Sequence, residues 1–339
     1  MNRHQGMKSP GNWLEALKVF EGGDDRKAVG QFILTLVLYL GILFGMFWMV
    51  LNGFPYWAIL LLSLPAGGFH MKLFIIMHDC GHNSFMKSTR ASTHIGRVCA
   101  FLTFTPYYDW LRSHAIHHAT VSNLDKRGTG DVWTMTSEEY RSSRRWKKVF
   151  YRIYRNPIFL FMVGPLLLFL VVFRFPRKNH NRRSISSVMS TNLAFAVMIT
   201  GFWITIGIIP YILVILPVMI VAGTAGVWLF YIQHQYPDVY WDRSATWDSV
   251  RAALEGSSFY RLPAVLRWFS GNIGYHHIHH LNPRIPNYRL RRCYQAVPEV
   301  QDVEPITILA SLKSLFLQVW DEQSRTLISI RGIERNVHV

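Results

Sequence analysis

The stretch "AVGQFILTLVLYLGILFGMFWMVLNGFPYWAILLLSLPAGGFHM" at residues 28–71 decides the fold class, because it contains no Asp, Glu, Lys or Arg. A second stretch without these residues covers positions 184–237. One membrane-spanning helix needs roughly 20 apolar residues, so each stretch is long enough for two spans. Turn signals divide both, "NGFPY" at 52–56 and "GIIPY" at 207–211. The sequence therefore predicts an all-α integral membrane protein with four transmembrane helices in two hairpins. The expected spans are residues 29–51, 56–77, 188–209 and 211–233.

Two shorter apolar segments are predicted to be re-entrant or interfacial. Residues 98–108 are too short to span as a helix. Residues 157–175 are marginal in length and have basic runs on both sides. Positive charge at both ends indicates that a segment enters and leaves on the same side of the membrane. With four complete spans, every histidine cluster of the chain lies on one membrane face, whereas a fifth span would separate them.

We expect a single domain over residues 1–339. The N-terminal sequence "MNRHQGMKSPGNWLEALKVFEGG" has no apolar core of a cleaved signal and is expected to form a cytoplasmic leader with a short amphipathic helix. The three cysteines Cys80, Cys99 and Cys293 have no metal or redox spacing, so a reduced cytoplasmic face is the simpler assumption. The expected parts are a leader (1–25), a first hairpin (29–77), a cap segment (78–183), a second hairpin (188–233) and a second cap segment (234–339).

The net charge of +16 raises the question of a nucleic-acid partner. The basic runs "RRWKK" (144–148) and "RKNHNRR" (177–183) argue against it, because they stand beside apolar segments. Such runs are typical of cytoplasmic, juxtamembrane charge near anionic lipid. The sequence therefore predicts a multi-pass protein of the cell membrane, with a histidine-rich helical cap on the cytoplasmic face and no nucleic-acid partner.

Three histidine clusters carry the chemistry: "HDCGH" at 78–82, "HAIHH" at 114–118 and "HHIHH" at 276–280. Residues three and four apart lie on one face of a helix, so each cluster can present several imidazoles together. One more histidine ends the last predicted span. A metal ion takes about four to six ligands, so nine nitrogens indicate two metals, and neutral imidazole suits zinc, copper, iron or nickel. The nine candidates are His78, His82, His114, His117, His118, His234, His276, His279 and His280.

Other interpretations stay open at this point. Each cluster alone could be explained by packing, and the isolated His4, His70, His94, His180 and His338 are expected to be structural or solvated. The Glu-x-x-His pattern of carboxylate di-iron bundles is absent, as are nucleotide loops and Ser/His/Asp patterns. A metal-dependent oxidation of a lipid fits best, because a saturated acyl chain offers no acidic proton and no electrophilic carbon. A hydroxylase or ketolase of alkanes or carotenoids, and a metal transporter, are the alternatives.

The three motifs "HDCGHNSF", "HAIHH" and "HHIHH", in this order, resemble the histidine boxes of membrane fatty-acid desaturases. The flanking "RSHAIHHATVSNLDKRGTGDVWT" and "GYHHIHHLNPRIPNYRL" are similar to the bacterial acyl-lipid branch, close to Bacillus-type phospholipid desaturases, and the likeness covers roughly residues 25–320. The resemblance implies two non-haem irons, O2 as co-substrate, and insertion of a cis double bond.

Carried over residue by residue, the resemblance assigns eight box histidines as catalytic metal ligands and His234 as a further metal ligand. His277 falls in a variable position of the third box. The acyl-CoA branch has an asparagine where this chain has Phe230, so one iron is expected to be less fully ligated. The eight box histidines are His78, His82, His114, His117, His118, His276, His279 and His280.

The resemblance also implies two electrons from a carrier. No redox domain is visible in the sequence, so the expected donor is a separate ferredoxin or flavodoxin. The run 144–148 with Arg289, Arg291 and Arg292 is a candidate docking surface, although lipid headgroups explain these charges equally well. Four carboxylates near the boxes are candidates to orient the ligand imidazoles: Asp79, Asp109, Asp125 and Asp131.

Overall fold

Four long helices form the membrane part of the protein in the computed structural model, which describes residues 13–177 and 180–335. They are α2 (Asp25–Leu51), α3 (Tyr56–Gly81), α9 (Arg182–Ile206) and α10 (Ile208–His234). All four are long and apolar enough to cross a membrane. Many of their large apolar side chains face outward, such as Phe44, Trp203 and Ile204, which are 75%, 66% and 77% exposed. Outward-facing apolar side chains on such helices fit contact with lipid rather than water.

The hairpin turns lie close to the predicted positions. The side chain of Asp24 accepts the backbone N–H of Lys27 and caps α2. Between α9 and α10 the turn is shorter than expected, because Gly207 alone separates the two helices, with φ of +83°. This left-handed conformation is readily adopted only by glycine. The predicted span ends at 209 and 211 were therefore wrong by a few residues: the first helix ends at Ile206 and the second starts at Ile208.

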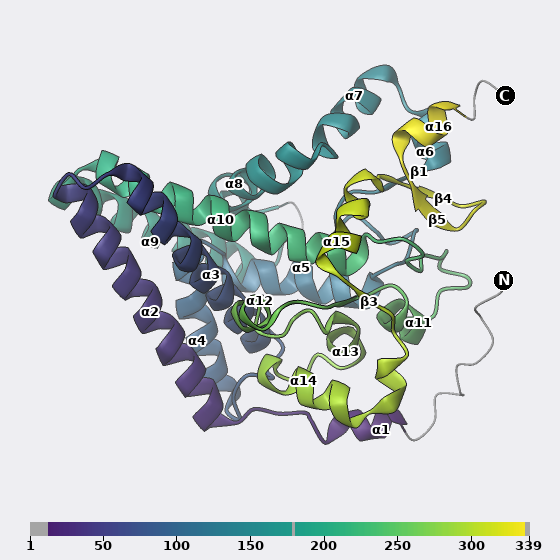
Figure 1. The fold of residues 1–339 in the computed structure, drawn as a ribbon, viewed down its shortest axis with the longest axis horizontal. Coiled ribbons are helices and arrows are strands. Elements are labelled where there is room, and N and C mark those ends of the chain that lie inside the picture. The colour runs from purple at the N-terminus through teal and green to yellow at the C-terminus, as the bar shows by residue number, and fades with distance from the viewer. Residues whose placement is uncertain (1–12, 178–179, 336–339) are drawn as a thin grey trace.

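The segment 98–108 is not one re-entrant segment. It covers the end of α4 (Thr89–Leu102), a turn, and the start of α5 (Tyr107–Thr120). Pro106 precedes the first residue of α5 and favours the break, because a proline at the start of a helix costs no hydrogen bond. Helix α4 packs along α3, and α5, which carries the second histidine cluster, packs on α9 (Figure 1).

The segment 157–175 forms three short pieces: a π-helix (Phe159–Val163), α8 (Gly164–Leu170) and a 3-10 turn (Val172–Arg174). Together they are bent by 65° from the preceding helix α7 (Arg145–Tyr154). As a helix, residues 159–174 would be about 24 Å long, which is shorter than the roughly 30 Å hydrocarbon core. The expectation that this segment enters and leaves on one side stays a prediction.

The cap consists of short helices and two small sheets that the hydropathy pattern did not predict. Strand β1 pairs with β4 in parallel and β4 with β5 in antiparallel orientation, while β2 and β3 form a second, parallel pair. Because these strands have only two or three residues, the chain remains essentially all-α. The strands are β1 (Met135–Thr136), β2 (Phe259–Tyr260), β3 (Pro305–Ile306), β4 (Val319–Asp321) and β5 (Thr326–Ile328). The cap helices are α1 (Trp13–Lys18), α6 (Ser137–Ser142), α11 (Ser249–Leu254), α12 (Ala264–Phe269), α13 (His276–Leu281), α14 (Asn287–Ala296), α15 (Ile308–Ser311) and α16 (Ile330–Arg335), with 3-10 turns at Pro298–Gln301 and Leu312–Phe316.

Two apolar cores hold the cap and the bundle together. One lies among the long helices and includes Tyr39, Ile76 and Val218. The other surrounds the C-terminal end of α10 and packs it against the cap through residues such as Ile232 and Ile278. The ends of α3 and α10 therefore meet the cap at one end of the bundle (Figure 1).

Reporter fusions test the topology. Fusions after residues 90, 130, 180, 240 and 300 are expected to report the cytoplasm, and fusions after 54 and 207 the outside, because the histidines of the cap can meet only if their segments share one face. A fusion after 180 on the opposite side from one after 130 would show that residues 157–175 span the membrane, and another segment would then have to cross as well.

Candidate metal centre

Nine buried or half-buried histidines converge where the bundle meets the cap, and they form two groups. Within each group the ligating nitrogens lie within 4.8 Å of one another. The first histidine group consists of His78, His82, His114, His118 and His279, and the second of His117, His234, His276 and His280. These are the nine candidates of the sequence analysis, and their arrangement in two groups agrees with the expectation of two metals.

Four helix ends supply the nine side chains. The last turn of α3 and its capping residue contribute two to the first group, and α10 contributes its last residue to the second. Helices α5 and α13 each serve both groups. On α5, His114 and His118 are four residues apart and share a face, while His117 is turned toward the second group. The spacing of the motifs thus divides their side chains between two sites.

Within each group the Nε2 atoms face one another. One imidazole carries at most one N–H when neutral, so hydrogen bonds alone do not satisfy so many facing nitrogens. Two nitrogens bound at right angles to one ion at about 2.1 Å are about 3 Å apart. The donor set therefore fits a metal in each group. The Nε2–Nε2 distances are 3.0 Å for His82–His114, 3.1 Å for His114–His118, 3.0 Å for His118–His279, 3.2 Å for His117–His234, 3.0 Å for His234–His276 and 3.0 Å for His276–His280.

Three of the imidazoles are oriented by an oxygen at the other ring nitrogen. Nδ1 of His78 lies 3.0 Å from Oδ1 of Asp79, and Nδ1 of His117 lies 2.6 Å from Oδ1 of Asp131. Nδ1 of His234 lies 3.0 Å from the carbonyl oxygen of Gly256. An acceptor at Nδ1 draws the proton there and leaves the lone pair of Nε2 for a metal.

The two carboxylates are themselves fixed. Oδ2 of Asp79 accepts the backbone N–H and the side-chain amide of Asn287, at 2.7 and 2.8 Å. Asp131 follows a loop that passes close to α5. At Gly130, with φ of +73°, a Cβ atom would lie 2.9 Å from the carbonyl oxygen of Ser113, so a larger residue would push Asp131 away from His117.

The other two candidate carboxylates do not contact the nine histidines. Asp109 lies 2.5 Å from Nδ1 of His180, and Asp125 forms an ion pair of 2.6 Å with Arg243. The prediction for these two was wrong, because Asp109 lies on α5 beside His180 and Asp125 lies beyond the end of that helix beside Arg243. Proximity in sequence to a histidine box does not bring either carboxylate to a ligand imidazole. The pairing also gives His180 a structural role, as expected.

Burial favours the uncharged form of six of these imidazoles. It lowers their pKa well below the ordinary histidine value, and neighbouring imidazoles add to the effect. A neutral imidazole is the form that binds a metal. This effect is found for His82, His114, His118, His276, His279 and His280.

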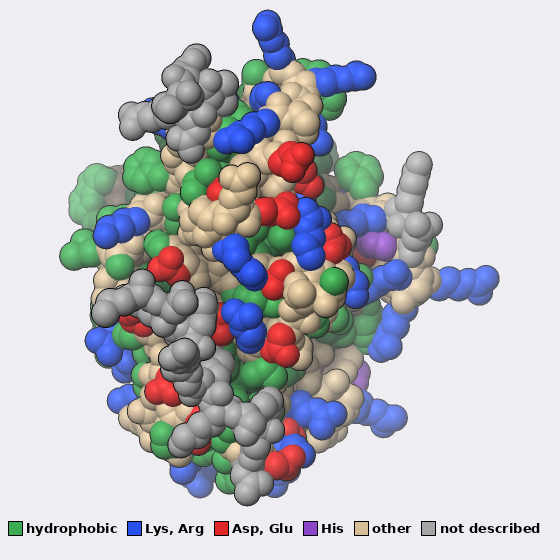
Figure 2. Space-filling model, turned by 90° about the vertical axis from the view of Figure 1, so that its right-hand side faces the viewer, with side chains coloured by type: hydrophobic (Ala, Val, Ile, Leu, Met, Phe, Trp, Pro, Cys, Tyr) green, Lys and Arg blue, Asp and Glu red, His purple; other side chains and the backbone are tan. Residues whose placement is uncertain are grey.

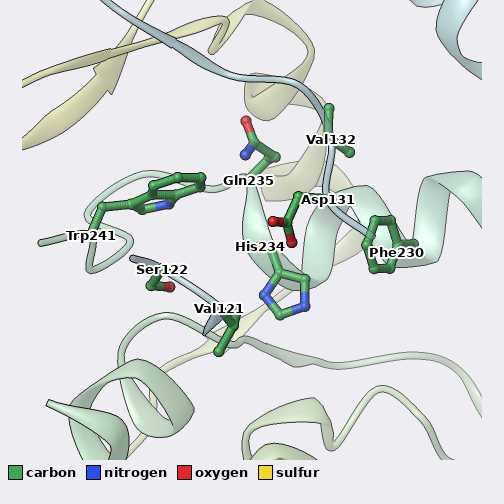
Figure 3. Close-up of a pocket in the computed structure, with 8 residues that line it drawn as sticks. All are labelled: Val121, Ser122, Asp131, Val132, Phe230, His234, Gln235 and Trp241. Carbon is green, nitrogen blue, oxygen red and sulfur yellow. The ribbon is translucent and has the colours of Figure 1, made fainter. Parts of the chain in front are cut away.

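An apolar residue and a small pocket border the second group. The ring of Phe230 lies 5.4 Å from that of His117 and 5.6 Å from that of His234, between ring centroids. Figure 3 shows Phe230 together with His234 and Asp131 around a cavity of about 10 Å³, roughly the space of one water molecule. The second group has four imidazoles and the first has five. The expectation that one iron is less fully ligated stays a prediction.

His277 belongs to neither group. Its Nε2 lies 3.0 Å from the carbonyl oxygen of Val300, and burial lowers its pKa to about 4. Of the isolated histidines, His70 is structural, with Nδ1 at 2.9 Å from the hydroxyl of Tyr39, and His94 is exposed. His4 and His338 lie outside the described residues.

Three contacts of the site were not predicted from the sequence. They are the amide of Asn287 on Asp79, the carbonyl of Gly256 on His234, and the ring of Trp110, which stacks on His114 with 4.5 Å between centroids. Trp110 is four residues before His114, so helical spacing could have suggested it. The other two contacts join segments more than 20 residues apart, and only the folded chain shows them.

The candidate docking charges differ in their surroundings. Arg289 donates to the carbonyl oxygen of Glu21 at 2.8 Å and is partly buried, so it supports the chain after α1. Arg291 and Arg292 are exposed. Figure 2 shows that on the face carrying the C-terminal strands, acidic and basic side chains are interspersed and histidine is nearly absent. The histidine groups are therefore covered by the cap on this side.

Comparisons with known proteins agree with this geometry. A sequence profile described as fatty acid desaturase matches residues 52–307. A protein named fatty acid desaturase in Bacillus subtilis is 44% identical over 279 residues, which is 82% of this chain and 79% of the relative. An sn-1 acyl-lipid omega-3 desaturase (ferredoxin) of Synechocystis is 27% identical over 70% of this chain and 66% of its own length. An sn-1 oleoyl-lipid 12-desaturase of the same genus is 24% identical over 80% and 76%.

Replacing any one of the nine grouped histidines by Ala is expected to lower the metal content of the purified protein, measured by elemental analysis, from about two ions per chain. His277→Ala is the matched control, since it removes a buried imidazole from α13, the helix of the third motif, and leaves both histidine groups intact. It is expected to keep the metal and to lose stability through its missing hydrogen bond. Equal loss of metal in this control would show that the third motif has been assigned in the wrong register.

Proposed function

The chain belongs to the fatty acid desaturase family, and we propose that it inserts a cis double bond into the acyl chains of membrane phospholipids. As a fatty acid desaturase it is an oxidoreductase. The observation that carries the proposal is the pair of histidine groups, five and four imidazoles, which lie where the apolar helices α3 and α10 end. Relatives whose names specify acyl-lipid or oleoyl-lipid substrates support a substrate esterified in the membrane.

We propose that each histidine group holds one non-haem iron. When bound, the two irons would supply the redox chemistry by which O2 is reduced to two waters. The acyl chain loses two hydrogen atoms in this reaction. The other two electrons and two protons come from outside the protein. The nine histidines are the proposed ligands. The eight of the three sequence motifs and His234 offer only imidazole nitrogen, a donor type that suits iron.

The surrounding residues hold this ligand set in place. Asp79 and Asp131 fix the proton of two imidazoles on Nδ1, and Asn287 fixes Asp79 in turn. The rings of Trp110 and Phe230 cover part of the two groups with apolar surface, which reduces the room for water beside them. Exclusion of water matters here, because a saturated chain and a reactive oxidant have to meet without side reactions.

We propose that the protein is a multi-pass protein of the cell membrane with its cap on the cytoplasmic face. The first turn of α2 contains Arg26 and Lys27 after Asp25, and α9 begins with Arg182 and Arg183. The hairpin turns at 52–55 and 207 carry no charge. Excess positive charge marks the cytoplasmic side. The proposed single domain of residues 1–339 then has both cap segments, 78–183 and 234–339, on that side.

The alternatives fit less well. A transporter usually carries its polar ligands near the middle of the membrane. Here His82 follows the last residue of α3 and His234 is the last residue of α10. A hydroxylase or ketolase would use the same metals and oxygen, and the names of the relatives argue for desaturation.

We propose a small acidic carrier, a ferredoxin or flavodoxin, as the electron donor. One relative carries ferredoxin in its name. The proposed docking surface is the basic run Arg144, Arg145, Lys147 and Lys148 at the start of α7. The same helix exposes Trp146, Val149, Phe150 and Ile153, spaced to form one apolar stripe, so a membrane surface is the competing partner of this run.

Expression in a host that lacks desaturases tests the function. Mass spectrometry of the host phospholipids is expected to show acyl chains with one new cis double bond, dependent on O2 and absent with the His114→Ala variant. The His277→Ala variant serves as the matched control and is expected to retain product. Hydroxylated or keto products, or metal flux without lipid products, would contradict the proposal.

The donor is tested in isolated membranes. Activity is expected to require an added ferredoxin or flavodoxin with its reductase, and the half-saturating donor concentration should rise with ionic strength, because salt screens the attraction between opposite charges. Replacing Arg144, Arg145, Lys147 and Lys148 by Gln should raise the half-saturating donor concentration at low ionic strength, because the attracting charges are removed. Lys87→Gln/Arg90→Gln, which removes two exposed charges of α4 and the loop before it, is the control. An unchanged concentration and salt dependence in the quadruple variant would assign the run to lipid instead.

A further inference from the structure

An open groove of about 730 Å³ lies between α4, the first turn of α5 and the first turns of α9. None of its lining residues belongs to the two histidine groups. The groove is far larger than the cavity of about 10 Å³ beside His234, and it lies on the membrane part of the molecule, where α9 begins. The groove is therefore a candidate binding site that is separate from the two histidine groups.

Two arginines line the groove and make it electropositive. Arg97 comes from α4 and Arg183 from α9, and both are exposed. The guanidinium of Arg183 is held 3.9 Å above the ring of Tyr108, the second residue of α5. Within the described part of the chain neither arginine forms an ion pair with a carboxylate, and no acidic residue lines the groove.

Helix dipoles strengthen the positive potential. The first turn of α9 contains no acidic residue but has two arginines. Helix α5 also begins at the groove, and the one acidic residue of its first turn, Asp109, is paired with His180. The N-terminus of a helix carries partial positive charge, which is unfavourable for a cation and favourable for an anion. Two cations at such a position, without a counter-ion from the protein, are stabilised by an external anion. Arginine binds phosphate oxygens with two parallel hydrogen bonds.

The groove changes from polar to apolar along α9. Ser186 and Ser187 lie near Arg183, and Ala194 lies about 12 Å further along the helix by its rise per residue. Val98 and Phe101 of α4 line the opposite wall. The hydroxyl groups of Ser190 and Thr191 donate to the carbonyl oxygen of Ser187, so they leave anion binding to the arginines. A ligand with an anionic head and an apolar chain fits this gradient.

We propose that the groove binds the phosphate group of a membrane phospholipid between Arg97 and Arg183, and that this lipid is the substrate. The second part rests on the proposed function. Helix α5 connects the two sites, because Tyr108 lines the groove and His114 lies six residues later, about 9 Å along the axis. An acyl chain esterified to the bound lipid is long enough to cover that distance.

Lipid binding by the purified full-length protein tests the inference. The ligands are a short-chain phosphatidylglycerol, a galactosyl diacylglycerol with the same chains, and inorganic phosphate as a competitor. The Arg97→Gln/Arg183→Gln variant should raise the half-saturating concentration of phosphatidylglycerol about tenfold or more, since two charge-assisted contacts are lost. Lys87→Gln/Arg90→Gln is the matched control, because it removes two exposed positive charges at the start of α4 and in the loop before it, outside the groove and away from the first turn of α9. It should leave binding unchanged.

The galactolipid, which has no phosphate, should bind the Arg97→Gln/Arg183→Gln variant and the parent protein equally. Equal binding of phosphatidylglycerol by all variants would overturn the site. Inorganic phosphate that displaces the lipid completely at equal concentration would show a free-phosphate site instead. A protein that binds lipid through these arginines but forms no desaturated product would refute the proposed function and leave the site standing. Normal phospholipid desaturation at low substrate concentration in the Arg97→Gln/Arg183→Gln variant would refute only the substrate role of the groove.

Discussion

The mutual approach of nine buried or half-buried imidazoles is the constraint on which the rest of the structure depends. The Nε2 atoms of eight of them lie 3.0–3.2 Å apart along two chains of contacts, while a neutral imidazole has only one N–H to donate. Buried nitrogens that face one another without protons between them are costly. The arrangement is stable only when something shares those lone pairs, and a metal ion in each group is the simplest such partner.

This constraint explains contacts that would otherwise look incidental. Asp79 joins His78 to Asn287 at the start of α14, and so ties the end of a membrane helix to the last part of the cap. The buried guanidinium of Arg155 ties α10 to the cap in another place, by donating to Gln235 at 3.0 Å and to the carbonyl oxygen of Leu317 at 2.7 Å. Both of these acceptors are uncharged. The contacts of Arg155 therefore hold the end of α10 against the cap but do not neutralise the charge of the guanidinium. Both contacts limit the relative movement of the segments that carry the histidines.

The sequence predicted the elements that depend on residues close together in the chain. Charge-free stretches marked the four long helices, and spacings of three and four residues marked the histidines that share a helix face. It failed where the outcome depends on contacts between distant segments. Asp109 was expected beside a ligand histidine and instead pairs with His180. The pairing of β1 with β4 joins Met135 to Val319, and no local pattern contains that information. The single-residue turn at Gly207 was misplaced because Pro210, taken as part of the turn, is accepted in the first turn of α10.

The position of the histidines on their helices favours a metal over a proton. His78 and His82 belong to the last turn and cap of α3, His117 and His118 to the last turn of α5, and His234 ends α10. The C-terminus of a helix carries partial negative charge and stabilises a cation within its last turn. The partial negative charge of the helix end would also stabilise a protonated imidazole. The added proton, however, would occupy the nitrogen that faces the neighbouring histidines, and the positive charge would be buried on a single ring. One divalent ion shared by four or five imidazoles gains the same field without protonating any of them. Three features of the site therefore favour a metal ion at the boundary between the apolar helices and the polar cap. They are the helix ends directed at one point, the burial of the site, and the excess of imidazole nitrogen.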